Sequence, residues 1–304
     1  TSTVTPPRTL CVGPLSEEES ALVALEQMGP EAVFDEACRE RALEIAREAK
    51  GVPIFVEELA RYRDALDLGQ GISLERFICW RVDTLPPEAR ALLEVVAVAG
   101  YPLPQAVAWE AADVATQGWP SIAVLCIKHL ARTHGRDPGD LIECYHDRVR
   151  EAVAASLDAE RWRACHLALA LSLEQAGDAD PERLLTHYLE ANEKDRAMGY
   201  ALTAADNASA SLAFDRAADL YGRCLELLPE DAPNRNEVLT KRASSLINAG
   251  RGPEAAEVYL EAADRVPPDQ AWQLKGQAAQ ALLANGHLER GKALLKEVLH
   301  TMGI

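Results

Sequence analysis

The sequence predicts a mainly α-helical protein of two or three domains that ends in a solenoid of paired helices. Its 304 residues contain only 5% aromatic side chains and are rich in alanine, which favours closely packed helices over a β-sandwich. One spacing of small residues, an aromatic residue and a proline also recurs in the C-terminal half. Its clearest copy has offsets of 7, 5, 4, 3 and 5 residues between Ala243, Gly250, Ala255, Tyr259, Ala262 and Pro267. Such a frame is typical of helix–turn–helix units that stack on copies of themselves.

The first predicted domain is a small group of helices over residues 15–70. Ser16 and Glu19 form a capping box, in which each side chain satisfies a backbone N–H of the other residue, and the helix they open ends at Gly29. Residues 1–14 look like the tail of a preceding domain, which suggests that the chain is a fragment of a larger protein.

Two further helices complete this first domain. Asp35 is placed to cap the second helix, and Gly51 closes it. The third helix is expected to run from Pro53 to about Leu66, because proline is well tolerated in a first helical turn.

Residues 73–157 are predicted to form a winged-helix domain. Asp137-Pro138-Gly139 is a strong turn signal between two short extended stretches, which indicates a β-hairpin. Several helices followed by a hairpin are the components of a winged helix. The predicted helices begin at Ser73 and cover residues 86–99, 104–115 and 120–132, and the hairpin strands cover residues 132–136 and 140–145.

Residues 158–304 are predicted to be helical repeats. Glycine and proline breakers separate the helices, among them Gly177, Pro229 and Gly286. The predicted pairs are 160–176 with 181–191, 195–210 with 214–227, 235–249 with 253–265, and 270–284 with 288–301.

The net charge and the cysteines limit where the protein can be located and what it can bind. The net charge of −17 opposes binding to nucleic acid or to an anionic membrane surface, and no apolar run approaches the length of a membrane span. Seven scattered cysteines without a C-x-x-C pair indicate reduced, mostly buried thiols. We therefore expect a cytoplasmic protein without nucleic-acid or membrane partners.

The repeat frame resembles the tetratricopeptide family over residues 198–304, and residues 236–269 match best. In that family, inward-facing residues of the first helix of each repeat line a groove for a partner. The resemblance therefore implies a protein or small-molecule inducer as the ligand of this repeat arm. The lysine and asparagine clamp that grips C-terminal carboxylates in chaperone-binding relatives is absent. In the best repeat the implied partner-binding residues are Glu237, Thr240, Ser244, Ile247 and Asn248.

A second resemblance covers nearly the whole chain. Gly51-Val52-Pro53-Ile54-Phe55-Val56-Glu57-Glu58-Leu59 resembles the "GNPLFVEEL" signature of bacterial STAND-type signalling ATPases, including large LuxR-type regulators and kinase- or cyclase-linked ATPases. Tyr145-His146-Asp147 resembles their winged-helix motif. The order in that family is P-loop ATPase, helical lid, winged helix and helical repeat arm. The resemblance thus implies a helical lid plus a winged-helix domain followed by a tetratricopeptide-like (TPR-like) α-solenoid.

The family resemblance also implies two nucleotide-facing residues. Pro53 would lie near the base, and His146 would face the β-phosphate of ADP bound to an upstream ATPase domain. This sequence has no G-x-x-x-x-G-K-[ST] loop, so we expect no cofactor in this chain and ADP or ATP only in the parent protein. The simpler interpretations are a helix stop and restart at Gly51 and a half-buried histidine bonded to backbone.

Specific residues bear on whether the chain binds DNA or a metal ion. Lys128, His129 and Arg132 are expected on the third helix of the winged helix, the element that enters the groove in DNA readers. Apolar neighbours and the net charge favour a structural spacer instead. The histidines lack carboxylate or cysteine partners at metal-ligand spacing, so no metal site and no catalytic residue is predicted.

These observations lead to one functional hypothesis and two alternatives. The leading hypothesis is a non-catalytic regulatory and sensing segment of a STAND-type signalling ATPase, with an ADP/ATP switch located upstream. The alternatives are a stand-alone TPR scaffold that joins protein partners, and part of a LuxR-type transcription regulator whose DNA-binding module lies beyond Ile304.

Overall fold

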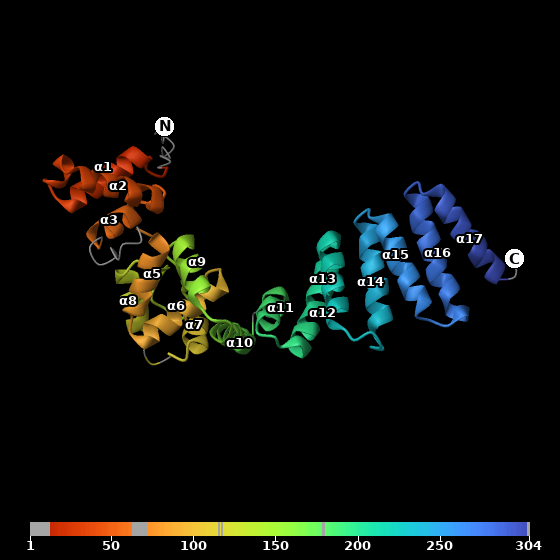
Figure 1. Cartoon of the computed structure of the whole chain (residues 1–304). Coiled ribbons are helices and arrows are strands. Elements are labelled where there is room, and N and C mark those ends of the chain that lie inside the picture. Colours follow the sequence, from red (N-terminus) through yellow and green to blue (C-terminus); the bar gives the residue numbers. More distant parts are fainter. Residues whose placement is uncertain (1–12, 63–71, 115, 117, 178–179, 303–304) are drawn as a thin grey trace, which may run out of the picture. The chain divides into compact units, whose positions relative to one another are not determined.

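The protein is described by a computed structural model that covers residues 13–62, 72–114, 116, 118–177 and 180–302. Most of these residues are helical, as predicted (Figure 1). The chain divides into an N-terminal unit, Thr1–Pro102 with Thr116–Leu157, and a repeat unit, Leu103–Ala115 with Asp158–Ile304. The predicted tail at residues 1–14 lies almost wholly outside the described residues.

The N-terminal unit begins with three helices that pack on one another. The capping box of Ser16 and Glu19 is present, and the Asp35 carboxylate accepts the Ala37 N–H at the start of the second helix, at 3.0 Å. The third helix starts at Pro53 as predicted but ends at Arg61. The elements are α1 Glu17–Met28, the short 3-10 helix η1 Ala32–Phe34, α2 Glu36–Ala49 and α3 Pro53–Arg61.

Gly51 lies between α2 and α3, and no other amino acid can take its place without strain. Its φ is +76°, and a Cβ built on it would lie 2.2 Å from the Leu15 carbonyl oxygen. The Gly51 carbonyl in turn accepts the Leu15 N–H at 2.9 Å. Backbone from the start of α1 therefore crosses directly over the turn that leads into Pro53.

The second half of the N-terminal unit surrounds one almost fully buried helix, α6. Leu92, Leu93, Val95 and Val96 are all at most 1% exposed, because α8, α9 and β3 pack around them. The hairpin is antiparallel, with Arg132 opposite Glu143. The elements are α5 Leu74–Asp83, α6 Pro87–Ala99, α8 Gly118–Ile127, β2 Ala131–Thr133, β3 Leu141–Cys144 and α9 Asp147–Ser156.

Two helices end earlier than the sequence predicts. Helix α7, Gln105–Ala111 in the repeat unit, stops before Asp113, and α8 stops before His129. Asp113 and His129 adopt φ values of 55° and 51°, and this left-handed backbone cannot continue a right-handed helix. Lys128 and His129 thus follow the helix, and Arg132 lies on β2. The expectation that all three lie on one groove-entering helix is wrong.

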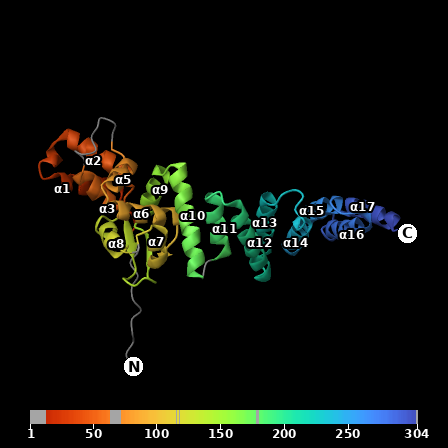
Figure 2. The same cartoon turned by 90° about the horizontal axis from the view of Figure 1, so that it is seen from below.

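The repeat unit is an array of helix pairs that follow one another in chain order (Figure 1, Figure 2). Helix α7 and the short strand β1, Leu103–Pro104, belong to the same unit, and α7 packs against α10. The observed bounds lie within two residues of the predicted ones. The helices are α10 Ala159–Ala176, α11 Pro181–Glu190, α12 Lys194–Ala210, α13 Phe214–Leu227, α14 Arg235–Asn248, α15 Gly252–Asp264, α16 Pro268–Ala284 and α17 Leu288–Thr301.

The residues of the repeat frame form the contacts between helices. Ala243, Ala255 and Ala262 are fully buried, and Tyr259 is 4% exposed. Alanine at these positions lets the two helix axes approach closely, while the tyrosine fills the space one turn later. These four frame residues occupy core positions, while Gly250 and Pro267 are exposed.

Ion pairs also join successive repeats, and they share one direction. In each of five pairs the acidic residue belongs to the earlier repeat and the basic residue to the later one, 33 to 36 residues on. We refer to these pairs as the inter-repeat ladder. They are Glu182–Arg216, Asp206–Lys241, Asp215–Arg251, Glu230–Arg265 and Glu257–Arg290.

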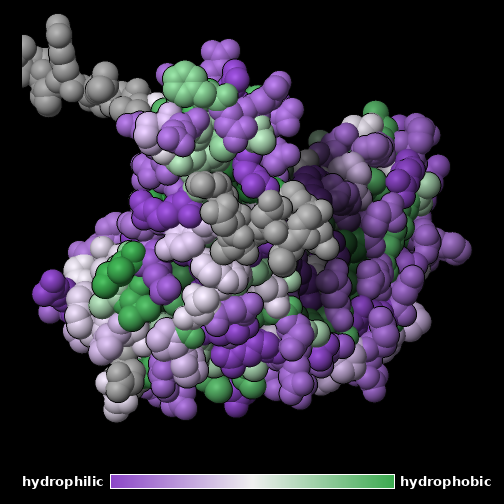
Figure 3. Space-filling view, turned by 60° about the vertical axis from the view of Figure 1, so that its left-hand side comes forward, coloured by the Kyte–Doolittle hydropathy of each residue, from purple (hydrophilic) through white to green (hydrophobic). Residues whose placement is uncertain are grey.

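One face of the molecule is largely polar (Figure 3). Hydrophilic side chains cover most of the face shown in Figure 3, and hydrophobic ones gather only in small spots. Among the described residues, no helix combines the length and the apolar character needed to cross a membrane. Of the six cysteines described, Cys165 and Cys224 are buried and four are half-buried, so the expectation of mostly buried thiols is wrong.

Candidate functional site

The first predicted site residue, Pro53, opens α3 at the protein surface. Val52 precedes it in extended backbone and acts as the N-cap, and Pro53 occupies the first turn, where its missing N–H leaves no bond unmade. Pro53 is exposed, while Phe55, two residues later, is only 5% exposed. The turn thus presents a rigid, apolar ring to solvent, while the helix that follows buries an aromatic ring.

The second predicted site residue, His146, caps the N-terminus of α9. Its Nδ1 accepts the Arg148 backbone N–H at 3.1 Å. A neutral imidazole with an accepting Nδ1 carries its proton on Nε2. The cap therefore fixes the tautomer and leaves the half-buried His146 with an Nε2–H that can donate a hydrogen bond.

The structure brings these two segments together at what we term the α3–α9 corner, formed by Pro53, Phe55 and His146. The Phe55 and His146 rings meet edge to face, with centroids 5.1 Å apart and an interplanar angle of 71°. Edge-to-face packing of this kind orients both rings. The partial positive charge at the N-terminus of α9 adds to the Nε2–H donor, so the corner suits an anionic group.

The five predicted partner-binding residues lie on α14, away from its buried face. Ser244, Ile247 and Asn248 are exposed, with Ile247 at 41%. Glu237 pairs with Lys241 at 3.3 Å, and the Thr240 hydroxyl donates to a backbone carbonyl within the helix. Helix α14 thus offers a small, polar surface with one apolar side chain near its end.

A polar network beside this surface was missed by the sequence reasoning. Asp206 on α12 accepts a hydrogen bond from the Tyr221 hydroxyl at 2.6 Å and pairs with the Lys241 ammonium at 3.1 Å. Burial and the bond to Asp206 raise the pKa of Tyr221. Burial opposes the charge of Lys241, but Asp206 and Glu237 together raise its pKa. The 35-residue separation of Asp206 and Lys241, close to the repeat period, could have predicted the pair.

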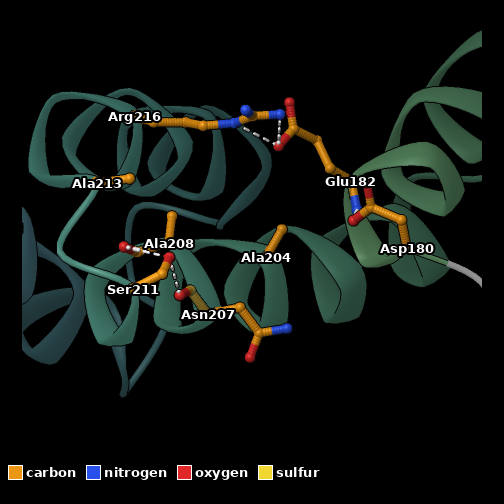
Figure 4. A pocket seen from close by; sticks show the side chains of 8 residues that line it. All are labelled: Asp180, Glu182, Ala204, Asn207, Ala208, Ser211, Ala213 and Arg216. Carbon is orange, nitrogen blue, oxygen red and sulfur yellow. Dashed lines mark hydrogen bonds and ion pairs between the residues drawn. The ribbon is translucent and has the colours of Figure 1, made fainter. Parts of the chain in front are cut away.

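A shallow pocket of about 240 Å³ lies between α11, α12 and α13 (Figure 4). The Arg216 guanidinium crosses its rim to the Glu182 carboxylate at 2.6 Å, and the Ser211 hydroxyl donates to the Asn207 carbonyl at 2.8 Å. Asp180 accepts the Glu182 N–H. Because these polar groups bind one another, the pocket does not assign a ligand.

Two histidines that no motif predicted form a buried contact between α10 and α11. His166 and His187 are 3% and 2% exposed, and their Nδ1 atoms are 2.9 Å apart. Burial lowers the pKa of each ring to about 4, with the Glu190 charge opposing the shift at His166. Trp162 packs on His166 at 4.7 Å and donates its indole N–H to Glu190. The two rings are therefore neutral near pH 7.

The remaining candidates have structural partners. Arg132 and His134 bind the Glu143 carboxylate across the hairpin, at 2.8 and 3.2 Å. His129 packs on the Tyr145 ring at 5.5 Å. Within the described part of the chain, no cluster of three or more histidine, cysteine, aspartate or glutamate residues is arranged to hold a metal ion.

Comparisons with known proteins support the fold. No protein-family model and no curated protein matches the sequence. A crystal structure is similar: that of a Signal Transduction ATPase with Numerous Domains (STAND) protein with a tetratricopeptide repeat sensor, from Pyrococcus horikoshii. This chain resembles it in fold. The TM-score is 0.51 at 15% sequence identity, and the match covers 95% of this chain but 41% of that chain. The chain therefore spans less than half the length of that STAND protein.

Proposed function

We propose that this chain is the non-catalytic regulatory and sensing segment of a STAND-type signalling ATPase in the bacterial cytoplasm. The observation that carries the proposal is the α3–α9 corner. Two segments that resemble the family's lid and winged-helix motifs, about 90 residues apart in sequence, meet there through Phe55 and His146. The fold similarity to a STAND protein with a repeat sensor supports the same assignment.

In this proposal each part of the chain has a separate role. Pro53 packs near the base of ADP held by an upstream P-loop domain, and the His146 Nε2–H donates to the β-phosphate. The repeat unit binds a protein or a small-molecule inducer along α14. Such a ligand shifts the equilibrium between closed and open states only by its difference in affinity for the two.

Titration calorimetry with ADP tests the division between this chain and the upstream domain. The chain alone has no P-loop, so we expect no binding at micromolar ADP. Joining the chain to a P-loop domain encoded upstream of Thr1 should create tight binding. Micromolar or tighter binding by the chain alone would contradict the assignment, and so would an upstream gene sequence without a P-loop. The latter result would instead favour a stand-alone scaffold.

His146→Asn in the joined protein tests the phosphate contact. Asparagine is a good N-cap, so it keeps the bond to the Arg148 N–H, but it removes the Nε2–H donor. A hydrogen bond to a charged group contributes about 1.5–3 kcal/mol, so the ADP dissociation constant should rise roughly tenfold to a hundredfold. Basal signalling should rise with it.

The matched control is His134→Asn, which changes an exposed histidine on the hairpin loop. It should leave ADP affinity unchanged. Equal affinities for the parent and His146→Asn proteins would exclude a role for His146 in holding the nucleotide.

A further inference from the structure

A buried ion pair connects α3 to α5 on the side of α3 that carries the α3–α9 corner. The Glu58 carboxylate and the Arg81 guanidinium are 2.7 Å apart, with side chains 10% and 12% exposed. The guanidinium also lies over the Phe77 ring, 5.3 Å from its centroid. By contrast, the Arg216 side chain in the inter-repeat ladder is 62% exposed. Because water barely reaches Glu58 or Arg81, neither charge can lose its partner without a large desolvation penalty.

A second carboxylate joins the same pair of segments. Glu48, on α2, accepts the Leu74 backbone N–H at 3.2 Å. Leu74 is the first residue of α5, where backbone N–H groups have no partner within the helix. Helices α2 and α3 therefore both bind α5, one at its end and one along its side.

The position of Glu58 on α3 gives the ion pair a specific consequence. Phe55 and Glu58 are three residues apart and lie on the same side of the helix. Phe55 reaches the His146 ring, and Glu58 reaches Arg81. Because α3 already packs on α1 and α2, the contacts made by Phe55 and Glu58 fix how this group of helices meets α5 and α9. Helix α5 in turn packs on α9, which carries His146 at its N-terminus.

We propose that Glu58 and Arg81 are positioning residues that hold α3 against α5 and thereby hold Phe55 against His146. It follows that the contact between Phe55 and His146 weakens when the Glu58–Arg81 pair is broken. The role of His146 rests on the proposed function, but the contact between Phe55 and His146 can be measured without nucleotide.

Nuclear magnetic resonance of the His146 ring tests the proposal. The Phe55 ring current shifts the His146 ring protons because the two rings are in contact. His146→Asn identifies the resonance, and Phe55→Leu gives its position without the ring current. In Glu58→Gln, which keeps the shape but removes the charge, we expect the resonance to move by at least half of the way towards its Phe55→Leu position.

Glu57→Gln is the matched control, since it removes the same charge from the neighbouring residue of α3. Glu57 is half-buried, and its variant should leave the His146 resonance in place. Equal movement in both variants would overturn the proposal, because any loss of charge on α3 would then suffice.

A double variant, Glu58→Gln with Arg81→Met, covers the case in which a lone buried arginine prevents folding. Removing both charges avoids an unpaired buried ion, so this variant should fold. Its stability should approach that of the parent while the His146 resonance stays displaced. If the Glu58–Arg81 pair served stability alone, the His146 resonance of the folded double variant would match that of the parent. That result would overturn the proposal. Since no ADP is present, this outcome is independent of the nucleotide titrations.

Discussion

At the scale of single residues, the contact between His166 and His187 makes the first helix pair of the repeat unit sensitive to pH. One Nδ1 must donate and the other accept, so the pair exists only while at least one ring is neutral. The pKa of each ring, about 4, lies below the usual 6.5 because both are buried. Between pH 6.5 and 4 the unfolded chain therefore binds more protons than the folded chain.

We expect the free energy of unfolding to be highest above pH 6.5 and to fall as the pH drops towards 4. One ring accounts for roughly 3 kcal/mol of this loss, and that ring contributes no further loss below pH 4. Urea unfolding followed by tryptophan fluorescence, with Trp162 beside the pair, measures the effect.

Carboxylates titrate over the same range, so the comparison needs a variant without the pair. His166→Leu with His187→Leu should unfold with a clearly smaller dependence on pH. His300→Gln, at an exposed histidine near the end of α17, should behave like the parent. Identical pH profiles for the double variant and the parent would mean that the pair does not titrate as described.

Ala243 provides a second prediction at this scale. It is fully buried where α14 meets its neighbours, so a larger side chain must displace them. Ala243→Leu should lower the free energy of unfolding by about 1–3 kcal/mol, measured by urea denaturation. Ser244→Leu places the same side chain on the exposed face of α14 and should change stability by roughly 0.5 kcal/mol or less.

At the scale of elements, the sequence predicts the repeat helices well and the ends of the shorter helices poorly. Breakers such as Gly177 and Pro229 stop helices through their own backbone chemistry, which is visible in the sequence. The end of α8 depends instead on tertiary structure: the chain leaves the helix through a left-handed His129 so that Leu130 can turn into the core. Histidine is enriched at positive φ, but most histidines do not adopt it, so His129 alone does not predict where the helix ends.

The same distinction applies to the candidate sites. Pro53 and His146 belong to short motifs, and the structure places their segments in contact. The pairs Glu58–Arg81 and His166–His187 join different helices over 23 and 21 residues. Neither spacing matches the repeat period or a helical period, so no local pattern could have predicted these contacts.

Arg251 tests the inter-repeat ladder. It precedes α15 and pairs with Asp215 at 3.5 Å and with Glu254 at 2.6 Å. Arg251→Met keeps the apolar stem and removes the charge, so it should lower the free energy of unfolding by about 0.2–1 kcal/mol for each pair lost. The difference should shrink in about 1 M salt, where the screening length is short.

Arg223→Met is the control for this prediction, because Arg223 is exposed on α13 outside the ladder. Urea midpoints at low and high salt compare the two variants. A salt-independent loss for Arg251→Met would point to packing of the stem rather than to the ion pairs.

At the scale of the whole molecule, the chain contains two units with separate cores. Compact units with their own cores unfold as separate cooperative blocks, and repeat arrays often lose their end repeats first. We expect two unfolding transitions. Variants that keep only Trp80, in the N-terminal unit, or only Trp272, in α16, should report different urea midpoints. Coincident midpoints would show that the two units unfold as a single block.

The common direction of the inter-repeat ladder bears on how this array can change in length. Each of the two inner repeats, α12 with α13 and α14 with α15, supplies an acid to its successor and a base to its predecessor. A tandem duplication of about one repeat in the gene would insert a copy whose charges are met on both sides at once. The array could thus lengthen or shorten by recombination with these ion pairs formed again on both sides of the change.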